Sequence, residues 1–428
     1  MALSVAVAPL AVAACGPSIS PAPSATSSAP RPTAPASAPQ PTAPASGGLA
    51  ASLADPTAPA GAASAGPLTL RVGAIYDVSG PQSSLDSPSA AGARLAASDP
   101  TLPGRGREVS IGLSLVDGGA GAGTLAERAA ELAGRSDVGI GLSDTDGVLA
   151  AAPPFQAVGV PFVTSGATSP ALPAQVGDRL WLACFGDNVQ AAAGAEYAAK
   201  AFGMTAVVLF DTSADYTRGL SRYFIAAFRG LGGTVNTIVP YPGHTTSLAS
   251  RAGQIAGATP RPDFVYLAAL PTNVGNLVRS LRDAGIAIPI LGGDGLDTPD
   301  LVAQAGPTAD GVAFTTHAFL SATDGSPAVR AFVAKYRAAY GEDPPNAFAA
   351  LGYDTVALVA DAAARAGSPD PAAIQRALGA TVDFPGVTGR ITFADGSHIP
   401  RKEVAIVEIR DGKPQLAATI MPGSVPAP

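Results

Sequence analysis

From Leu68 onward, short apolar runs alternate with longer segments in which apolar residues recur at helical spacing. Runs such as LTLRVGAIY, AVVLFD and DFVYLAAL are almost continuously apolar, which is typical of strands buried on both faces. Segments such as TLAERAAELAG and NVGNLVRSLRDAG carry apolar residues every three or four positions and end in glycine. The alternation predicts repeated strand–helix–strand units, and therefore parallel sheets with helices on both faces.

The series is long enough for two such sheets. A helix-rich stretch covers 326–380, and two late strands are expected near RITFAD and EVAIVEI. With 428 residues, the chain exceeds a single ordinary domain and can bury two cores of common size.

Polar clusters follow several of the expected strands. SGPQSSLDS follows the first strand, SDTD follows VGIGL, SGATSP follows PFVT, DTSADYTRG follows AVVLF, and GGDGLDTPD follows IPIL. Ligands bind beyond the carboxyl ends of the strands in open parallel sheets. The clusters therefore predict the walls of a binding site.

Composition excludes some classes of protein. The formal charge is -7, and the Lys and Arg residues are scattered along the chain, which argues against a nucleic-acid partner. Only two cysteines occur, Cys15 and Cys184, too few for a disulfide framework. His244, His317 and His398 are far apart and have no metal-ligand spacing, so neither a metal site nor a catalytic triad is predicted.

The first fifteen residues, MALSVAVAPLAVAAC, form an apolar run ending in small residues. The run is too short to span a bilayer, which needs about 20 residues, but it suits a signal peptide. VAAC resembles the lipobox of bacterial lipoproteins, which predicts lipidation at Cys15, although a basic residue near the start is absent. An ordinary signal peptide with a chance cysteine is the alternative. Residues 16–67 are almost entirely Pro, Ala, Ser, Thr and Gly, which predicts a disordered linker.

Several motifs resemble the branched-chain amino-acid-binding family, the type I periplasmic receptors of ABC importers. VSGPQSSLDSPSAAGARLA is similar to that family's opening stretch, and IGLSDTDGVLAAAPPFQAVGVPFVTSGATSP is similar to its next block. DYTRGL and FADGSHIPRKEVAIVEIRDGK are similar to its second-lobe motif and its closing strands. The resemblance covers residues 68 to about 416.

The resemblance implies the type I periplasmic binding protein fold: two Rossmann-like lobes, each a parallel sheet flanked by helices, joined by a multi-strand hinge. It implies a first lobe of 68–185 and 317–386 and a second lobe of 186–316 and 387–422.

The resemblance also implies a binding site. Thr145 and Thr168 would hold the α-carboxylate of a ligand, the Gly166 carbonyl and Asp294 its ammonium group, and Tyr216 would cover it. Ala167 belongs to the same segment. The chain departs from the family at Leu85, where a large aromatic often sits, and at Leu270 and Pro271. Asp144 and Asp146 beside Thr145 favour a ligand larger or more cationic than leucine.

Each of these residues also has a structural interpretation. Thr145 and Thr168 could be helix N-caps, Asp294 a turn residue, and Tyr216 part of a helix face. The loop GGAGAG superficially resembles a dinucleotide-binding loop, but Thr124 stands where its last Gly should be. No cofactor is expected.

The preferred hypothesis is a lipid-anchored, extracytoplasmic solute-binding protein of an ABC importer. Its partners would be a small amino-acid-like ligand, or a related amine or amide, and the permease subunits, with membrane contact through the N-terminal lipid only. The alternative is a ligand sensor of the same fold that reports to a membrane receptor or kinase. The sequence shows no nucleophile and base at a suitable spacing, which argues against an enzyme. A repressor of this fold would need an N-terminal pair of DNA-binding helices, where this chain has the predicted linker.

The lipobox hypothesis is testable in cells. Labelling with a palmitate analogue is expected to mark the wild-type protein and to miss Cys15→Ser, because the thiol is the attachment point. Equal labelling of the two proteins would contradict lipidation at this cysteine.

Overall fold

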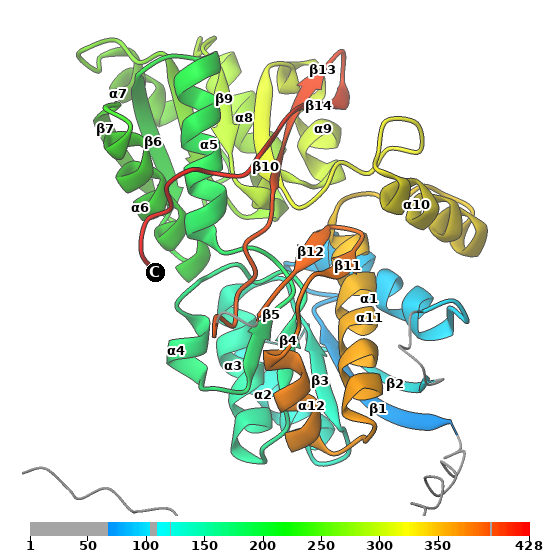
Figure 1. Cartoon of the computed structure of the whole chain (residues 1–428). Coiled ribbons are helices and arrows are strands. Elements are labelled where there is room, and N and C mark those ends of the chain that lie inside the picture. Colours follow the sequence, from blue (N-terminus) through cyan, green and yellow to red (C-terminus); the bar gives the residue numbers. More distant parts are fainter. Residues whose placement is uncertain (1–66, 103–108, 120, 394–395) are drawn as a thin grey trace, which may run out of the picture. The chain divides into compact units, whose positions relative to one another are not determined.

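The computed structural model describes residues 67–102, 109–119, 121–393 and 396–428 (Figure 1). The predicted signal peptide, Cys15 and all but the last residue of the predicted linker lie outside the described residues. No helix in the described part of the chain is long and apolar enough to cross a membrane.

The chain first builds a parallel sheet of five strands. Its elements are β1 (Leu68–Tyr76), α1 (Ser83–Ser98), β2 (Val109–Asp117), α2 (Ala122–Ala133), β3 (Val138–Gly141), α3 (Thr145–Ala157), β4 (Phe162–Thr164), α4 (Leu172–Val176) and β5 (Leu180–Leu182). The strand order is β2-β1-β3-β4-β5. The sheet and the helices that pack on it form the first lobe.

A second sheet follows. Its elements are α5 (Asp187–Ala201), β6 (Thr205–Asp211), α6 (Asp215–Gly230), β7 (Thr234–Tyr241), η1 (Ala249–Arg251), α7 (Ala252–Ala256), β8 (Phe264–Ala268), η2 (Pro271–Asn273), α8 (Val274–Asp283), β9 (Ile290–Gly292), η3 (Asp294–Leu296), α9 (Pro299–Ala305), η4 (Gly306–Ala309) and β10 (Val312–Thr316). Read from β7, the order is β7-β6-β8-β9-β10, which repeats the pattern of the first sheet.

The remaining elements divide between the two lobes. They are α10 (Pro327–Tyr340), α11 (Phe348–Ala366), α12 (Pro371–Gly379), β11 (Phe384–Gly386), β12 (Gly389–Ile391), β13 (Val404–Arg410) and β14 (Lys413–Ile420). Helices α10 to α12 contribute to the core of the first sheet, whereas β13 and β14 extend the second sheet beyond β10.

The predicted two-lobed α/β fold is confirmed, with one difference. The second sheet is mixed, because β13 pairs antiparallel with β10, and β14 pairs antiparallel with β13. β13 and β14 form a hairpin whose turn uses positive φ angles at Asp411 and Gly412, so the chain must reverse direction there.

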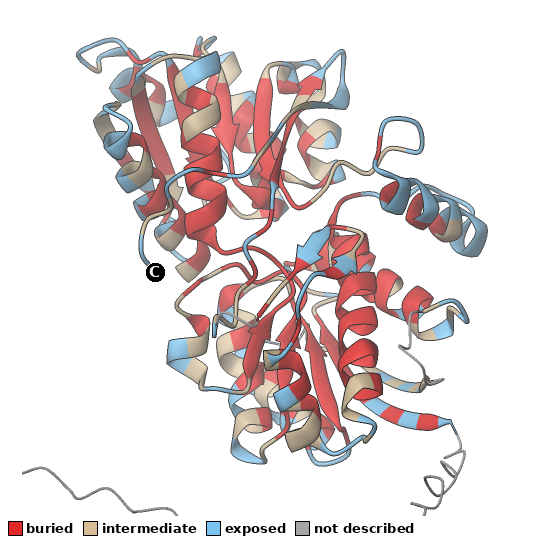
Figure 2. Cartoon of the chain, in the orientation of Figure 1, coloured by how far each residue is buried: buried red, intermediate tan, exposed pale blue. Residues whose placement is uncertain are grey.

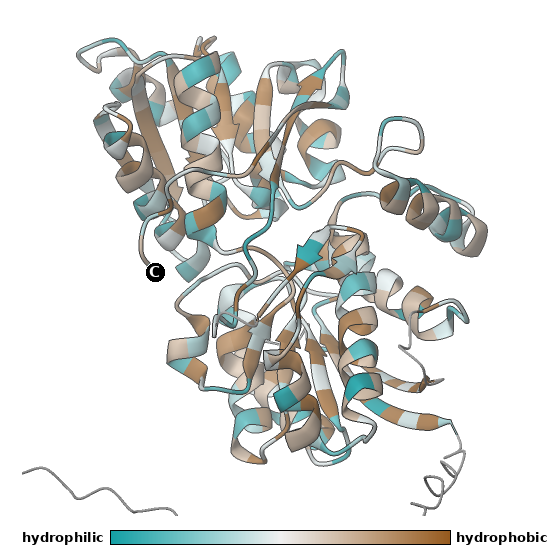
Figure 3. Cartoon of the chain, in the orientation of Figure 1, coloured by the Kyte–Doolittle hydropathy of each residue, from teal (hydrophilic) through white to brown (hydrophobic). Residues whose placement is uncertain are grey.

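Burial follows the predicted apolar runs. The central strands of both sheets are buried, and exposed residues lie on the outward faces of the helices (Figure 2). The apolar colouring of β6 in Figure 3 corresponds to the run AVVLF. The edge strand β2 instead alternates partly buried and exposed positions over most of its length, as a strand with a neighbour on one side does.

Helices α1 and α11 pack unusually closely at two glycines. A Cβ atom added to Gly92 would lie 1.8 Å from the Ala349 carbonyl oxygen, and one added to Gly352 would lie 1.8 Å from that of Ser89. Any larger residue would push the two helices apart. Almost every residue of α11 is buried as a result of its packing in this core.

The chain passes between the lobes after β5, after β10 and before β13. Ile391 and Phe393 pack in the core of the first sheet, and the chain joins the second sheet only at Val404. The boundary that the sequence placed at residue 387 therefore shifts toward β13, because β12 pairs with β11 and not with the second sheet.

A buried lysine ties the crossing segment before β13 to the one after β5. The Lys402 Nζ donates to the Ala183 carbonyl at 3.1 Å and to the Thr388 hydroxyl at 2.5 Å. That hydroxyl donates in turn to Asp354 at 2.6 Å, and burial lowers the pKa of Lys402 while Asp354 opposes the change. The network holds three segments that are remote in sequence at one point between the lobes.

Candidate ligand-binding cleft

A cavity lies where the carboxyl ends of strands from both sheets meet. Residues that follow β1, β3 and β4 line it from the first lobe, and residues that follow β6, β8 and β9 line it from the second. The strand order reverses between β1 and β3 in the first sheet and between β6 and β8 in the second. Open parallel sheets bind ligands at such a reversal. The lining residues are Gln82, Leu85, Ser143, Asp144, Thr168, Tyr216, Leu270, Pro271, Asp294, Gly295 and Phe348.

The cavity is narrow in this conformation. It measures about 270 Å³ to the atomic surfaces, but only about 10 Å³ accepts the centre of a water molecule. That is room for about one water. A ligand the size of an amino acid therefore fits only when the walls move apart.

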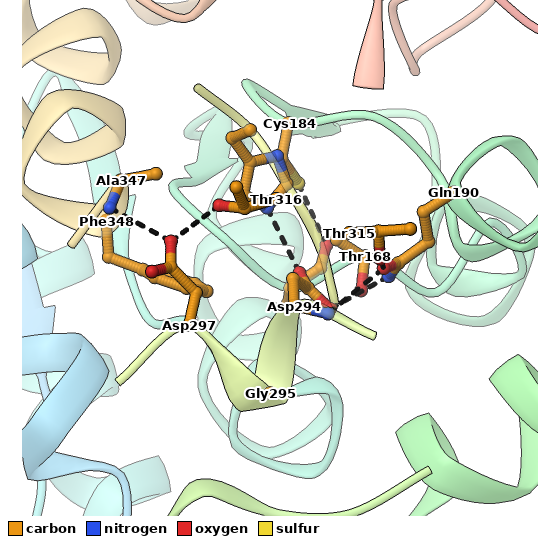
Figure 4. Close-up of polar contacts among 12 residues, drawn as sticks. Thr168, Cys184, Gln190, Asp294, Gly295, Asp297, Thr315, Thr316, Ala347 and Phe348 are labelled. Atoms are coloured by element: carbon orange, nitrogen blue, oxygen red, sulfur yellow. Dashed lines mark hydrogen bonds and ion pairs between the residues drawn. The ribbon is translucent and has the colours of Figure 1, made fainter. Parts of the chain in front are cut away.

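Asp294 is the most heavily bonded side chain of the cleft. Its Oδ1 accepts from the Tyr216 hydroxyl at 2.8 Å, and its Oδ2 lies 3.0 Å from the His317 Nε2. The Oδ1 also accepts from the Gln190 amide at 2.8 Å (Figure 4). Tyr216 is fixed in turn by the Gly295 N–H, which donates to its hydroxyl at 3.0 Å. These donors fix the orientation of the carboxylate.

His317 contributes a neutral donor to this arrangement. The side chain is fully buried, and burial lowers its pKa despite the neighbouring Asp294. Its ring stacks on Phe185 with 4.0 Å between the ring centroids, and its Nδ1 has no partner among the described residues. The imidazole is therefore uncharged at neutral pH, and the contact with Asp294 is a hydrogen bond rather than an ion pair.

Gln190 links Asp294 to a second buried acid, Asp187. The Gln190 Nε2 donates to both carboxyl groups, at 2.8 Å to Asp294 and 2.9 Å to Asp187. The Gln190 Oε1 accepts from Thr315 at 2.6 Å, which fixes the orientation of the amide. Thr168 bonds the same Asp187 oxygen at 2.8 Å.

Asp187 carries a proton more readily than an ordinary aspartate. It is completely buried, its Oδ2 has no partner among the described residues, and burial, followed by the charge of Asp294, raises its pKa to about 8. Its Oδ1 accepts from both Thr168 and Gln190, so the unpartnered Oδ2 is the oxygen that can carry the proton.

Several of the residues predicted from the sequence line this cavity. Thr168, Tyr216, Asp294 and Leu85 all belong to its lining, as do Leu270 and Pro271. Thr168 and Asp294 are only 1% and 2% exposed, so both are packed and hydrogen-bonded rather than placed on free loops.

Thr145, Gly166 and Ala167 are not among the lining residues. Thr145 is the first residue of α3 and is buried, with its hydroxyl unpartnered among the described residues. A Cβ at Gly166 would lie 2.7 Å from the Phe348 ring, so this glycine lets a lining aromatic pack closely. The Ala167 carbonyl accepts from the Cys184 thiol at 3.4 Å, and its N–H bonds Thr164.

The structure also bears on the purely structural interpretations of Thr145, Asp294 and Tyr216. The N-cap of α3 is Asp144, which accepts from the Gly147 N–H at 2.8 Å, and not Thr145. Asp294 begins the short helix η3, and the Tyr216 hydroxyl is used inside the cleft. Cys184 is fully buried, and burial raises the pKa of its thiol.

The sequence alone did not identify Gln82, Asp187, Gln190, His317 or Phe348. Asp187 and Gln190 follow the short strand β5, and His317 directly follows β10, so the rule about strand ends applies to them. Neither strand was predicted, because LWL is too short to stand out and VAFTT ends in two threonines. No group of three or more potential metal ligands occurs among the described residues.

These features define a class of protein: a two-lobed receptor that binds a small molecule between its lobes. Residues 69–414 match the family model described as periplasmic binding protein. The chain belongs to this family and is similar to substrate-binding proteins of ABC transporters of the branched-chain amino acid type. Membership implies an extracytoplasmic location.

The relatives of known sequence are solute-binding proteins. The Leu/Ile/Val-binding protein homolog 3 of Brucella melitensis is 29% identical over 261 residues, which are 60% of this chain and 68% of the relative. The protein BraC3 of Rhizobium johnstonii, described as Leu/Ile/Val-binding, is 27% identical over 259 residues, with the same shares.

Solved structures agree in fold. The leucine-binding protein LivK of Thermotoga maritima has a TM-score of 0.75 and 29% identity, covering 82% of this chain and 99% of its own. The LivJ protein of Streptococcus pneumoniae in complex with isoleucine has a TM-score of 0.74 and 26% identity, covering 83% and 100%. A solute-binding protein of R. palustris in complex with benzoate, at 22% identity, shares the fold.

The buried acid Asp187 predicts how stability depends on pH. Between about pH 4 and pH 8 the folded protein holds a proton that the unfolded chain has released, so the free energy of unfolding falls as pH rises through this window. Asp187→Asn should remove about 2 kcal/mol of the decrease between pH 6 and pH 8, at about 1.4 kcal/mol per unit. Denaturant unfolding of the ligand-free protein at several pH values measures this change.

Other buried acids also make the free energy of unfolding depend on pH. Burial raises the pKa of Asp86 to about 7 and that of Asp297 to about 6, so some decrease with pH remains in the variant. Equal slopes in the wild type and in Asp187→Asn would show that Asp187 is already ionised at pH 6.

Proposed function

We propose that the protein binds a ligand with an ammonium group, an amino acid or a related small amine or amide, between its lobes and delivers it to an ABC permease. The observation that carries this proposal is Asp294, a carboxylate that is 2% exposed and faces a cleft whose lining contains no Lys or Arg. A buried carboxylate without a positive partner is costly. An ammonium group of the ligand would supply that partner.

The donors around Asp294 support this role. Tyr216, Gln190 and His317 hold the carboxylate without neutralising it, because none of them carries a positive charge. Charge-assisted hydrogen bonds to an ammonium are shorter and stronger than neutral ones. The protein thus orients the acid and leaves its charge to be balanced by the ligand.

Thr168 suits the other end of an amino acid. The Thr168 hydroxyl donates to Asp187, and a proton on that acid would make it a weaker acceptor, so the hydroxyl could turn to donate to a ligand carboxylate. Hydrogen bonds to charged groups contribute roughly 1.5–3 kcal/mol. The proposal therefore keeps Thr168 as a ligand contact and adds Asp187 as the acid that competes for its hydroxyl proton.

Closure of the lobes would complete the site. Residues of both lobes line the cavity, which in this conformation admits only about one water molecule. A ligand that contacts both walls stabilises the closed arrangement over the open one. The Asp215 N–H at the start of α6 donates to Asp146 of α3 at 3.3 Å, and the Ala347 N–H donates to Asp297 at 3.1 Å, so closure has its own contacts between the lobes.

The relatives favour transport over other outputs. Their descriptions name branched-chain amino-acid binding, and one structural relative was solved with isoleucine. The lipobox-like VAAC and the Pro-rich stretch after it suggest that a lipid on Cys15 tethers the receptor beside its permease.

Replacing the charge of Asp294 tests the proposal. A thermal-shift screen of amino acids, amides and amines first identifies a ligand, and calorimetric titration then compares the wild type with Asp294→Asn. Affinity should fall roughly 30-fold or more, because losing one member of a desolvated charge pair costs about 2–5 kcal/mol, at about 1.4 kcal/mol per tenfold. Asparagine keeps the size of the side chain and its ability to accept from Tyr216.

Asp283→Asn is the matched control, since it removes one negative charge from an exposed position of the same lobe. It should leave affinity unchanged. Benzoate should not bind, because it has no ammonium for Asp294 and the lining residues offer its carboxylate no cation. Tight benzoate binding, or equal affinity in Asp294→Asn, would overturn the proposal.

A further inference from the structure

A second cavity continues the cleft on the side of the first lobe. It is larger than the first cavity, at about 560 Å³ against about 270 Å³ to the atomic surfaces, and it shares Gln82 and Asp144 with the first cavity. Asp77, which follows β1, and Asp146, near the start of α3, complete its acidic wall. The other lining residues are small or apolar: Pro81, Gly118, Gly119, Gly121, Ala122, Leu125, Leu142 and Gly147.

Each of the three carboxylates makes a hydrogen bond with one oxygen. Asp77 Oδ2 accepts from the Gln82 N–H at 3.0 Å, Asp144 Oδ2 from Gly147 at 2.8 Å, and Asp146 Oδ2 from Asp215 at 3.3 Å. Within the described residues the second oxygen of each makes no hydrogen bond, and that of Asp77 is buried. These oxygens remain available to a ligand.

The surroundings supply little positive charge. Burial raises the pKa of Asp144 to about 6, and the nearby charges of Asp146, Asp77 and Asp215 add to the increase. The cation that acts on Asp146 is Arg218, which already pairs with Asp215. The wall therefore keeps a net negative charge at neutral pH.

Gln82 independently indicates a ligand. The residue is only 9% exposed, lines both cavities, and makes no hydrogen bond through its amide group to any described residue. Its amide is therefore free to bond a molecule that enters the cavities. Its position between the two cavities is where a ligand that spans them would pass.

We propose that the ligand carries a second positive charge, and that this charge occupies the cavity formed by Asp77, Asp144 and Asp146. This inference rests on the proposed function, in which Asp294 holds the first ammonium group. The ligand class is then an amino acid with a cationic side chain, such as lysine or ornithine, or an aliphatic diamine of similar length. The Gln82 amide oxygen can accept from the second ammonium group, because Gln82 lines both cavities.

Pairs of ligands that differ only in the second charge test the proposal. Calorimetric titration of the full chain with lysine and norleucine, and with ornithine and norvaline, should show at least tenfold tighter binding of the cationic member of each pair. Cadaverine distinguishes a diamine ligand from a cationic amino acid, because it carries two ammonium groups and no α-carboxylate. The preference should shrink as salt is raised, since the acidic wall is partly exposed.

Asp144→Asn is the informative variant. Asparagine is as good an N-cap as aspartate, so α3 should keep its cap while the wall loses a charge. Lysine affinity should fall about tenfold and norleucine affinity should stay the same. Asp283→Asn on the second lobe should change neither.

The outcomes separate the two proposals. Norleucine or leucine binding as tightly as lysine, with both weakened by Asp294→Asn, would overturn the second charge and leave the proposed function standing. Equal losses of lysine and norleucine affinity in Asp144→Asn would also overturn the second charge, because the residue would then act through structure. Binding by none of these amines would overturn both proposals.

Discussion

The cleft is organised around a buried carboxylate that no positive side chain neutralises. Asp294 is almost fully buried, and its donors Tyr216, Gln190 and His317 are all uncharged. An unpaired charge in such a place is tolerated only if dipoles hold it and a cation can reach it. The three donors come from α6, from α5 and from the segment that follows β10, so the carboxylate is held from three parts of the second lobe.

The shared strand order of the two sheets places Asp294 opposite the loops of the first lobe. In both sheets the strand order reverses beside the first strand, which leaves a crevice there. Loops after β1 and β3 therefore face loops after β6, β8 and β9, and side chains from both lobes reach the same ligand. The buried Lys402 bonds both Ala183, after β5, and Thr388, so it joins the segment that leaves the first sheet to the one that leads to β13.

Protonation and ligand binding are coupled through Asp187. Gln190 donates to this acid and to Asp294, so an ammonium group bound at Asp294 lies close to both carboxyl groups. A positive charge there would favour the ionised form of Asp187 and oppose the effect of burial on its pKa. Affinity for the ligand and proton release would then be linked by one amide side chain.

The sequence by itself determined the fold class and most of the wall of the cleft. Continuous apolar runs and helical periods indicated two α/β lobes, and polar residues at strand ends placed Thr168, Tyr216, Leu85 and Asp294 in one site, because the hydrophobic pattern fixes where each strand stops. Tertiary structure decided the rest. Asp187, Gln190 and His317 follow strands that the apolar pattern did not reveal, and Thr145 does not line the cavity, while Asp144 caps α3. Hydrogen-bond partners and burial depend on which segments meet in space, and those contacts join residues more than a hundred positions apart, as Gln190 and Asp294 of the second lobe show.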